Sequence, residues 1–425
     1  MYVSCLCLKG CIYLGLEWDI PKVHIEKEVL SNSLRVIFCR KDYLTVTFRI
    51  LSRHGYRNET FPESVHLLEH MLFKPEERVF PIFQKIGGDI NGYVSTDEFS
   101  IYWNVPKIFQ DKAVDAVDRI INENKKHWTK DMLEREKRVI VREIGENYSD
   151  PKPFLNIFLR KKLFGEDTPG THSPQEIEKV FREVTLEDVR REVEYLAPEN
   201  SVLSSVGETT REVVERLDDW TGRSPEMKSL KPQPDYGLHI ADREILESYI
   251  SIGWISPPRS SVEAEILSLM GTILTAFPTS RLYKELRVKR GLVYFVGAMN
   301  VPYVDTGYFL IYTMTTPQNV GKVLEIIKEQ IQKIINEGPT EEELDDMKNM
   351  FFGALYNLTD SKLALSSVLA YNELFYNDAL RTYTVAARRV QELRIEDVIR
   401  AAKRYLDPDK AVICIVGEKS KIDIK

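Results

Sequence analysis

The residues best suited to chemistry lie in one short segment, His66-Leu67-Leu68-Glu69-His70. On a helix that turns about 100° per residue, both histidines and the glutamate share one face, while the two leucines point toward a core. Two imidazoles one turn apart can take adjacent corners of a zinc tetrahedron, and a carboxylate beside them can accept a proton from water. The alternative is a coincidence among structural histidines, which a chain with seven histidines would rarely produce. The H-x-x-E-H spacing therefore predicts a zinc site with Glu69 as its general base.

A catalytic zinc ion usually takes a third protein ligand, which here must come from elsewhere in the chain. The segment 133–151 reads as an amphipathic helix and offers Glu134, Glu136, Glu143 and Glu146. Glu136 and Glu143 are seven residues apart, so on a helix they share a face. Taken alone, such a helix is more often a solvated acidic surface, and the residues leave the third ligand open.

The histidine segment and its surroundings resemble the pitrilysin / insulin-degrading enzyme / mitochondrial processing peptidase family of zinc metallopeptidases. The resemblance extends over nearly the whole chain, from about Val23 onward. It rests on Gly55, Arg57 and Glu59 in a G-x-R-x-E pattern, HLLEHMLF (66–73), GGDINGYVSTDEFSIYW (87–103) and EREKRVIVREI (134–144).

The resemblance assigns roles on helix 133–151 that spacing alone does not. The family's E-x6-E pattern maps the third zinc ligand onto Glu143 and a supporting carboxylate onto Glu136. Glu146 is the fallback ligand, because it lies closer to the family's usual distance from the histidine motif. One zinc ion per chain is implied.

Two further segments resemble substrate-binding elements of the family. SRLYKELRVKRGLVYFV (280–296) matches its R-x6-Y element at Arg287 and Tyr294, which would stabilise a tetrahedral oxyanion or hold a substrate carbonyl. The strand-like run that contains Asn91, Gly92 and Tyr93 is implied to be an edge strand that pairs with an extended peptide. The alternatives are an ordinary surface arginine and core tyrosine, and an interior strand.

The sequence departs from the family's pattern near the histidine motif. Glu63 stands where the family usually has glycine, three residues before the first histidine, and Lys74-Pro75 replaces Lys-Gly-Thr. The segment from Phe73 to Gly87 is shorter than usual. These differences bear on the shape of the cleft, while the metal ligands themselves are intact.

The chain reads as two copies of one unit. TLEDVRREVEYLAPENSVLSSVGE (185–208) is echoed by RIEDVIRAAKRYLDPDKAVICIVGE (394–418), and WTKDMLEREK (128–137) by GPTEEELDDMK (338–348), each about 210 residues later. Thr129 and Thr340 stand where helix N-caps belong. We expect an N-terminal extension at 1–22, a catalytic zinc-binding domain at 23–220, a linker at 221–234 and a degenerate homologous domain at 235–425 that contributes substrate-binding residues.

Within each half, β-branched and aromatic runs are mixed with amphipathic segments. This pattern predicts an α+β fold of two homologous domains, each a mostly antiparallel sheet with helices packed on one face. The second half has a single histidine, His239, and no H-x-x-E-H, so one chain can build only one such site.

Composition narrows the class of protein. Lys plus Arg is 58 and Asp plus Glu is 65, giving a net charge of −7, which argues against nucleic-acid binding. No stretch reaches the roughly 18 apolar residues of a membrane span, and the N-terminus lacks the basic start of a signal peptide.

Cys5, Cys7 and Cys11 have no zinc-finger spacing, although a soft-metal site there is an alternative. Cys39 and Cys414 read as buried apolar residues. We expect a cytoplasmic protein.

These features together predict a zinc-dependent metalloendopeptidase or oligopeptidase acting on peptides or unfolded segments. Members of the resembled family enclose a chamber with four such domains, and a chain of this length supplies two, so the resemblance implies a dimer. Arg287 and Tyr294 would then act on the partner's zinc. A homodimer is expected, with a heterodimer of related subunits as the alternative. The alternative functions are a non-catalytic structural subunit, a processing protease for one peptide precursor, and a small-molecule metallohydrolase.

Overall fold

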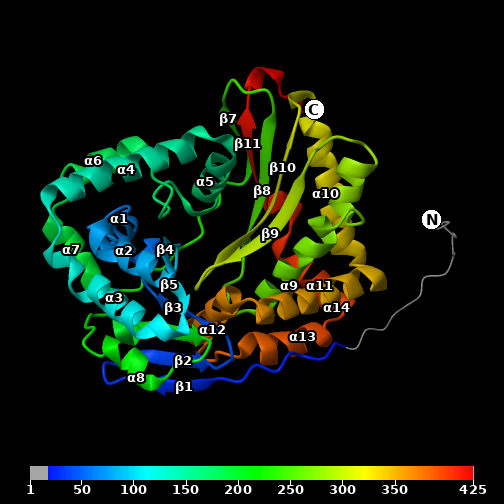
Figure 1. The fold of residues 1–425 in the computed structure, drawn as a ribbon. Coiled ribbons are helices and arrows are strands. Elements are labelled where there is room, and N and C mark those ends of the chain that lie inside the picture. The colour runs from blue at the N-terminus through cyan, green and yellow to red at the C-terminus, as the bar shows by residue number, and fades with distance from the viewer. Residues whose placement is uncertain (1–17, 425) are drawn as a thin grey trace, which may run out of the picture.

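The computed structural model describes residues 18–424, so Cys5, Cys7, Cys11 and most of the expected N-terminal extension lie outside the described residues. The described chain contains two sheets, one from each half, with helices packed against them (Figure 1). This arrangement confirms the predicted α+β class with two mostly antiparallel sheets. No helix within residues 18–424 has the length and apolar character needed to cross a membrane.

The first sheet has the strand order β1-β2-β6-β3-β5-β4. Strands β2 and β6 run parallel, and the other neighbours run antiparallel. Phe48 of β3 lies opposite Trp103 of β5, and the two buried rings stack at 5.2 Å. The strands are β1 (Glu26–Val29), β2 (Arg35–Cys39), β3 (Thr45–Ser52), β4 (Asp89–Val94), β5 (Phe99–Pro106) and β6 (Ser201–Val206).

The second sheet has five strands in the order β7-β11-β8-β10-β9, which repeats the order β2-β6-β3-β5-β4 of the first sheet without a counterpart of β1. Strands β7 and β11 run parallel, as β2 and β6 do, and Trp254 of β8 lies opposite Phe309 of β10, as Phe48 of β3 lies opposite Trp103 of β5. The internal repeat of the sequence therefore corresponds to a repeated strand order. The strands are β7 (Gly237–Asp242), β8 (Ser248–Ser256), β9 (Val296–Pro302), β10 (Gly307–Thr315) and β11 (Val412–Gly417).

One face of each sheet is covered by helices of its own half. In the first half these helices are α1 (Ser64–Leu72), α2 (Glu76–Ile86), α3 (Gln110–Asn122), α4 (Lys130–Ser149), α6 (Pro174–Phe181), α7 (Leu186–Glu194) and α8 (Arg211–Val214). In the second half they are α9 (Val262–Gly271), α10 (Val320–Glu337) and α14 (Ile395–Tyr405).

The opposite face of each sheet is covered by a helix from the other half. Helix α5 (Pro151–Phe164) packs its buried Leu159 on β8 of the second sheet, where Gly253 leaves room for the leucine. Helix α12 (Lys362–Tyr376) packs on β3 and β6 of the first sheet, with α11 (Glu341–Asp360) and α13 (Ala387–Gln391) beside it (Figure 1). This exchange joins the two halves through buried apolar surface.

The N-caps predicted for the two long helices are present. The Thr129 side chain accepts a hydrogen bond from the backbone N–H of Met132 at the start of α4. Thr340 forms a capping box with Glu343 at the start of α11. Each helix is 20 residues long, so α4 and α11 are matching elements of the two halves. Residues 221–236 contain neither helix nor strand.

Candidate metal centre and adjoining cleft

Helix α1 carries the H-x-x-E-H segment. Leu67 and Leu68 are fully buried in the first core, as the helical spacing predicts. The side chains of His66, Glu69 and His70 lie on the opposite face, with 20%, 17% and 16% of their surface exposed. The helix ends at Leu72, just before Lys74-Pro75, because a proline cannot continue it. The motif is thus held on a rigid helix but remains open to solvent.

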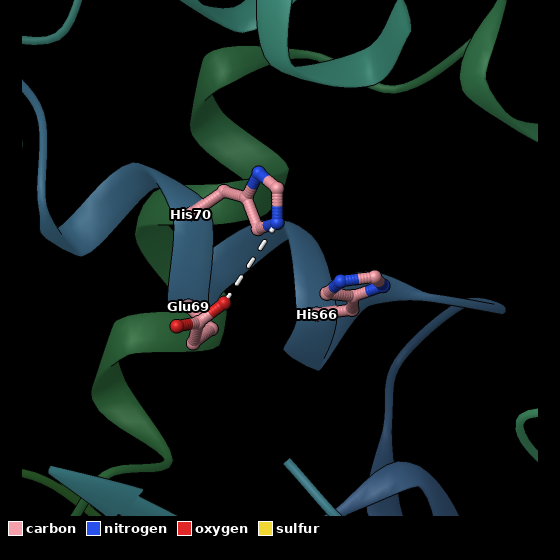
Figure 2. Close-up of side chains that lie close together, drawn as sticks. All are labelled: His66, Glu69 and His70. Atoms are coloured by element: carbon pink, nitrogen blue, oxygen red, sulfur yellow. Dashed lines mark ion pairs between the residues drawn. The ribbon is translucent and has the colours of Figure 1, made fainter. Parts of the chain in front are cut away.

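The three polar side chains of α1 converge on one region (Figure 2). Ligand atoms of His66, Glu69 and His70 all lie within 4.8 Å of one another. The two imidazole rings are 4.9 Å apart and nearly perpendicular. The Glu69 carboxylate approaches His70 Nε2 at 3.8 Å. The prediction from spacing, that these groups share a face, holds in the structure.

The structure brings Glu143, rather than Glu146, to the histidines. Helix α4 packs against α1, and Glu143 Oε2 lies 3.5 Å from Nε2 of His66 and 3.5 Å from Nε2 of His70. The Glu146 carboxylate is 71% exposed and faces Arg142 at 3.6 Å. Two imidazole nitrogens and one carboxylate oxygen directed at a common point are the donor types and number that a catalytic zinc ion takes.

The other ring nitrogen of each histidine faces a buried carboxylate. Glu136 Oε2 lies 3.2 Å from His70 Nδ1, and Glu63 Oε2 lies 2.9 Å from His66 Nδ1. A histidine whose Nδ1–H donates to a carboxylate presents the lone pair of Nε2 to a metal. The donor set therefore fits zinc in the orientation of its ligands as well as in their type. In the sequence, Glu63 stands out only as a departure from the family's glycine, and nothing there predicts a role for it at the site.

The charges around the cluster shift several pKa values. Burial works against protonation of His66, but the hydrogen bonds to Glu143 and Glu63 outweigh it and raise its pKa to about 9. Burial also raises the pKa of the Glu69 carboxyl, against the pull of the two histidines. A carboxylate with a raised pKa is a better proton acceptor for general-base work near neutral pH.

The two carboxylates of α4 are shifted in the opposite direction. Burial favours the neutral form of Glu136, but the hydrogen bond from His70 and the cations Lys74 and Arg135 outweigh it and lower the pKa to about 2. The hydrogen bond from His66 lowers the pKa of Glu143. Both side chains are therefore anionic at neutral pH, as a metal ligand and its supporting carboxylate must be.

Strand β4, which contains Asn91, Gly92 and Tyr93, is the edge strand of the first sheet. One face of this strand lies beside the histidine cluster, because a Cβ atom on Gly92 would stand 3.0 Å from Glu69 Oε1 and 3.1 Å from the Phe73 ring. A side chain at this position would crowd the Glu69 carboxylate and the Phe73 ring. The Asn91 side chain accepts a hydrogen bond from the N–H of Gly92, and the Tyr93 hydroxyl donates one to Glu98.

Arg287 and Tyr294 lie together in the second half, apart from the histidines. Arg287 lies near the end of a π-helix, Tyr283–Val288, and its guanidinium stacks over the Tyr294 ring at 4.7 Å. Tyr294 is 72% exposed. It borders an aromatic cavity of about 780 Å³ between α5 and the second sheet. Within residues 18–424, no hydrogen bond or ion pair connects either residue to His66, Glu69 or His70.

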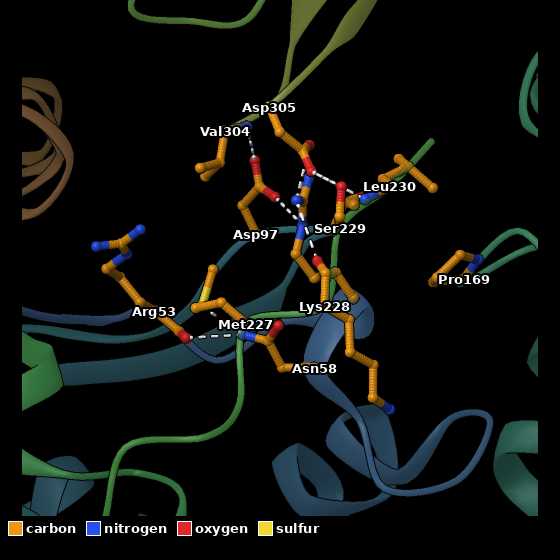
Figure 3. Close-up of polar contacts among 12 residues, drawn as sticks. Arg53, Asn58, Asp97, Pro169, Met227, Lys228, Ser229, Leu230, Val304 and Asp305 are labelled. Atoms are coloured by element: carbon orange, nitrogen blue, oxygen red, sulfur yellow. Dashed lines mark hydrogen bonds and ion pairs between the residues drawn. The ribbon is translucent and has the colours of Figure 1, made fainter. Parts of the chain in front are cut away.

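Polar contacts around Asp97 and Asp305 (Figure 3) link the G-x-R-x-E segment, which precedes α1, to the second half. Arg57 is 2% exposed and bridges Asp97 at 2.7 Å and Asp305 of the second half at 2.8 Å. The second Asp305 oxygen accepts hydrogen bonds from Ser229 and from the backbone N–H of Leu230, both at 2.9 Å. Gly55 has no room for a side chain, since a Cβ atom would lie 2.4 Å from the Ser95 carbonyl oxygen. The buried Arg57 ion pairs therefore hold the segment before α1 against the second half.

Comparisons with known protein families match most of the chain. The family model described as insulinase (peptidase family M16) matches residues 53–172, and the model described as peptidase M16 inactive domain matches residues 183–351. The first match contains the histidine cluster and α4. The second begins before α7 and continues into α11 of the second half.

Curated relatives with similar sequences are named as zinc proteases. An uncharacterized zinc protease of Mycobacterium bovis is 26% identical over 374 residues, which cover 83% of this chain and 84% of the relative. An uncharacterized zinc protease of Bacillus subtilis is 24% identical over 408 residues, which cover 92% and 98%.

Solved structures share the fold. A structure described as a peptidase M16 inactive domain from Pseudomonas fluorescens superposes with a TM-score of 0.84 at 21% identity, covering 95% of this chain and all of that one. A protease from Helicobacter pylori superposes with a TM-score of 0.82 at 19% identity, covering 93% and 100%. A chain of complex III from Candida albicans gives 0.80 at 15% identity, covering 94% and 98%.

Proposed function

Because the chain belongs to the peptidase M16 (insulinase/pitrilysin) family, as a two-domain member of the bacterial type, we propose that it is a zinc-dependent metalloendopeptidase or oligopeptidase. The observation that carries the proposal is the position of Glu143, whose Oε2 lies 3.5 Å from Nε2 of both His66 and His70, with the Glu69 carboxylate beside them. The curated relatives named as zinc proteases support the same class of reaction.

His66, His70 and Glu143 would hold the metal, and Glu136 would orient His70. Zinc, when bound, supplies a Lewis acid that polarises a peptide carbonyl and makes a neighbouring water more acidic. Glu69 is the general base in this proposal: its carboxylate takes a proton from the attacking water and passes it to the leaving amine. The raised pKa of Glu69 suits both transfers, since the group must accept and then release a proton.

The substrate would be an extended peptide held on β4. An edge strand offers backbone N–H and C=O groups to a peptide, and Gly92 places this strand beside Glu69. Asn91 and Tyr93 are two residues apart in β4, so their side chains share one face of the sheet and would contact substrate side chains on that face. Such binding needs an unfolded segment, so peptides and unstructured protein regions are the proposed substrates.

Arg287 and Tyr294 are proposed to act in a dimer. They lie on the second half, which would be a degenerate copy of the catalytic domain, with proposed limits of 23–220 for the catalytic domain and 235–425 for the copy. In a homodimer that encloses a chamber, the exposed Tyr294 of one subunit would reach the metal centre of the other. Its hydroxyl would donate a hydrogen bond to the oxyanion of the tetrahedral intermediate. A heterodimer with a related subunit would serve the same purpose.

Metal dependence tests this function. The purified protein is expected to contain about one zinc ion per chain and to cleave a quenched fluorescent peptide of about ten residues. A chelator should abolish cleavage, and stoichiometric zinc should restore it. Cleavage that persists after the metal has been removed and verified as absent would contradict the proposal. Zinc binding without cleavage of any peptide would instead favour a non-catalytic subunit or a protease for one precursor.

A further inference from the structure

The residue before α1, Glu63, has an unusual backbone conformation. It is the N-cap of the helix, with φ 65° and ψ 16°, in the left-handed region that favours glycine. An N-cap residue commonly stabilises a helix through its side chain, but the Glu63 side chain makes no capping hydrogen bond. Neither the backbone conformation nor helix capping explains a glutamate at this position.

The Glu63 carboxylate is buried and directed at the metal centre. Its side chain is 5% exposed, and Oε2 lies 2.9 Å from His66 Nδ1. Burying a carboxylate is costly unless a donor compensates for the lost water. The His66 imidazole supplies that donor, and this contact turns Nε2 of the same ring toward Glu143.

The contact has a counterpart on the second histidine. Glu136, whose side chain is 4% exposed, lies 3.2 Å from His70 Nδ1 in the same way. The two carboxylates come from different elements, the turn before α1 and the middle of α4. Each histidine is therefore held through Nδ1 by a separate buried carboxylate, and both Nε2 atoms lie 3.5 Å from Glu143 Oε2.

We propose that Glu63 is a positioning residue, which holds the His66 ring through Nδ1 and so increases the affinity of the centre for zinc. The proposal rests on the proposed function, in that it takes His66 to be a zinc ligand. A carboxylate hydrogen-bonded to a metal-binding histidine fixes the orientation of the ring and makes the ligating nitrogen more basic. The glycine found here in the resembled family would relieve the backbone but could not make this contact.

Two substitutions separate the carboxylate from the backbone. Glu63→Gly removes the carboxylate and suits the left-handed conformation, so the metal-free variant should melt at or above the temperature of the wild type. Its zinc dissociation constant, measured by competition with a chromophoric chelator, should rise about 10- to 100-fold. Glu63→Gln keeps an oxygen that can accept from Nδ1 but loses the charge, and its dissociation constant should fall between the other two. Glu77→Gln, an exposed change on α2, should bind zinc within twofold of the wild type.

In Glu63→Gly the zinc affinity should fall while the melting temperature is maintained or rises, and this combination excludes a merely structural role. A residue that only stabilises the fold would lower the melting temperature and the zinc affinity together. The proposal is overturned if Glu63→Gly binds zinc within twofold of the wild type, or if zinc affinity falls only in step with the melting temperature of the metal-free protein.

The test also distinguishes failure of this proposal from failure of the proposed function. Zinc affinity is measured without peptide, so a wild type that binds zinc but cleaves nothing would overturn the peptidase assignment alone. If that protein still shows the expected order of affinities, the role of Glu63 is supported. A wild type that binds no zinc would overturn both.

Discussion

The helix pair α1 and α4 and the helix pair α9 and α11 occupy matching places beside two sheets that share an order of five strands. Within residues 18–424, however, only the first pair carries a cluster of histidine and glutamate side chains that could hold a metal. When α4 and α11 are aligned at their N-caps, Thr129 and Thr340, Glu136 corresponds to the fully buried Met347 and Glu143 to Ala354. The second half therefore keeps the same fold with apolar residues at these two positions, where the first half has carboxylates.

The shorter helices also differ. Aligned by their buried positions, α1 and α9 place Glu265 opposite His66, Ser268 opposite Glu69 and Leu269 opposite His70. Glu265 is paired with Arg381 and Arg389 rather than with a histidine. This architecture therefore forms without the histidines, so their presence in the first half has a chemical reason rather than a structural one.

The largest expected effect comes from removing a metal ligand. His70→Ala should lose stoichiometric zinc and lower peptide cleavage by about 10³-fold or more, because the centre is left with two protein ligands. Ser268→Ala, a change on the corresponding exposed face of α9, should alter either quantity by less than about twofold. Metal analysis and a quenched peptide assay measure both. A similar loss in the two variants would contradict the difference between the helix pairs.

A second pair of variants tests which carboxylate of α4 binds the metal. Glu143→Gln should weaken zinc binding by about 10²-fold, since a neutral amide replaces a charged ligand directed at both histidines. Glu146→Gln lies three residues further along and removes an exposed carboxylate, so zinc affinity should stay within about twofold. Chelator competition gives both dissociation constants. The reverse order would make Glu146 the ligand.

A carboxylate placed in the second core tests whether that core tolerates a buried charge as the first does. Met347→Glu introduces at the matching position the residue found at 136, but without the lysine, arginine and histidine that surround Glu136. We expect the free energy of unfolding to fall by about 4 kcal/mol, because the new carboxyl is buried and unpaired. Urea denaturation measures the change, with Met347→Leu as the apolar control. Unchanged stability would mean that this core accepts charge as readily as the first.

The contact between the halves depends on a buried ion pair. Arg57→Met leaves the Asp305 carboxylate without its guanidinium and Asp97 with Arg259 as its remaining cationic partner. Loss of stability by about 3 kcal/mol is expected. Arg142→Met removes a 72% exposed arginine that faces Glu146 and should cost less than about 1 kcal/mol. Equal urea midpoints for the two variants would show that the buried network does not hold the halves together.

The smallest predicted effect is a pH dependence. The pKa of the Glu136 carboxyl is lowered to about 2, whereas an unfolded chain has a glutamate pKa near 4.3. The unfolded state therefore binds the additional proton, and this contribution to stability is present above about pH 4.5 and is lost as the pH falls toward 2. In the metal-free protein, Glu136→Gln should flatten part of the acid-induced fall in melting temperature. Parallel curves for variant and wild type would contradict the shift.

The sequence predicted those parts of the site that depend on short-range geometry. The convergence of His66, Glu69 and His70 follows from helical spacing, and the N-caps Thr129 and Thr340 follow from local hydrogen bonding. The repeated strand order was suggested by matching segments about 210 residues apart. Arg287 and Tyr294 remain predictions, because their proposed action depends on a second subunit.

Features that depend on tertiary packing could not be predicted in the same way. The approach of Glu143 rather than Glu146 to the histidines depends on how α4 packs against α1. The role of Glu63 depends on a left-handed backbone conformation that a glutamate rarely adopts. The exchange of α5 and α12 between the sheets was missed because an apolar face shows that something covers it but not which helix does so.

The most direct test of the account compares the wild type with Glu69→Gln. Zinc content and cleavage of one quenched fluorescent peptide are measured on the same preparations. We expect about one zinc ion per chain in both proteins. Cleavage should fall by at least about 10²-fold in the variant, because the proton acceptor is lost while the zinc ligands remain. Full activity in a zinc-loaded Glu69→Gln protein would contradict the assignment of Glu69 as the general base.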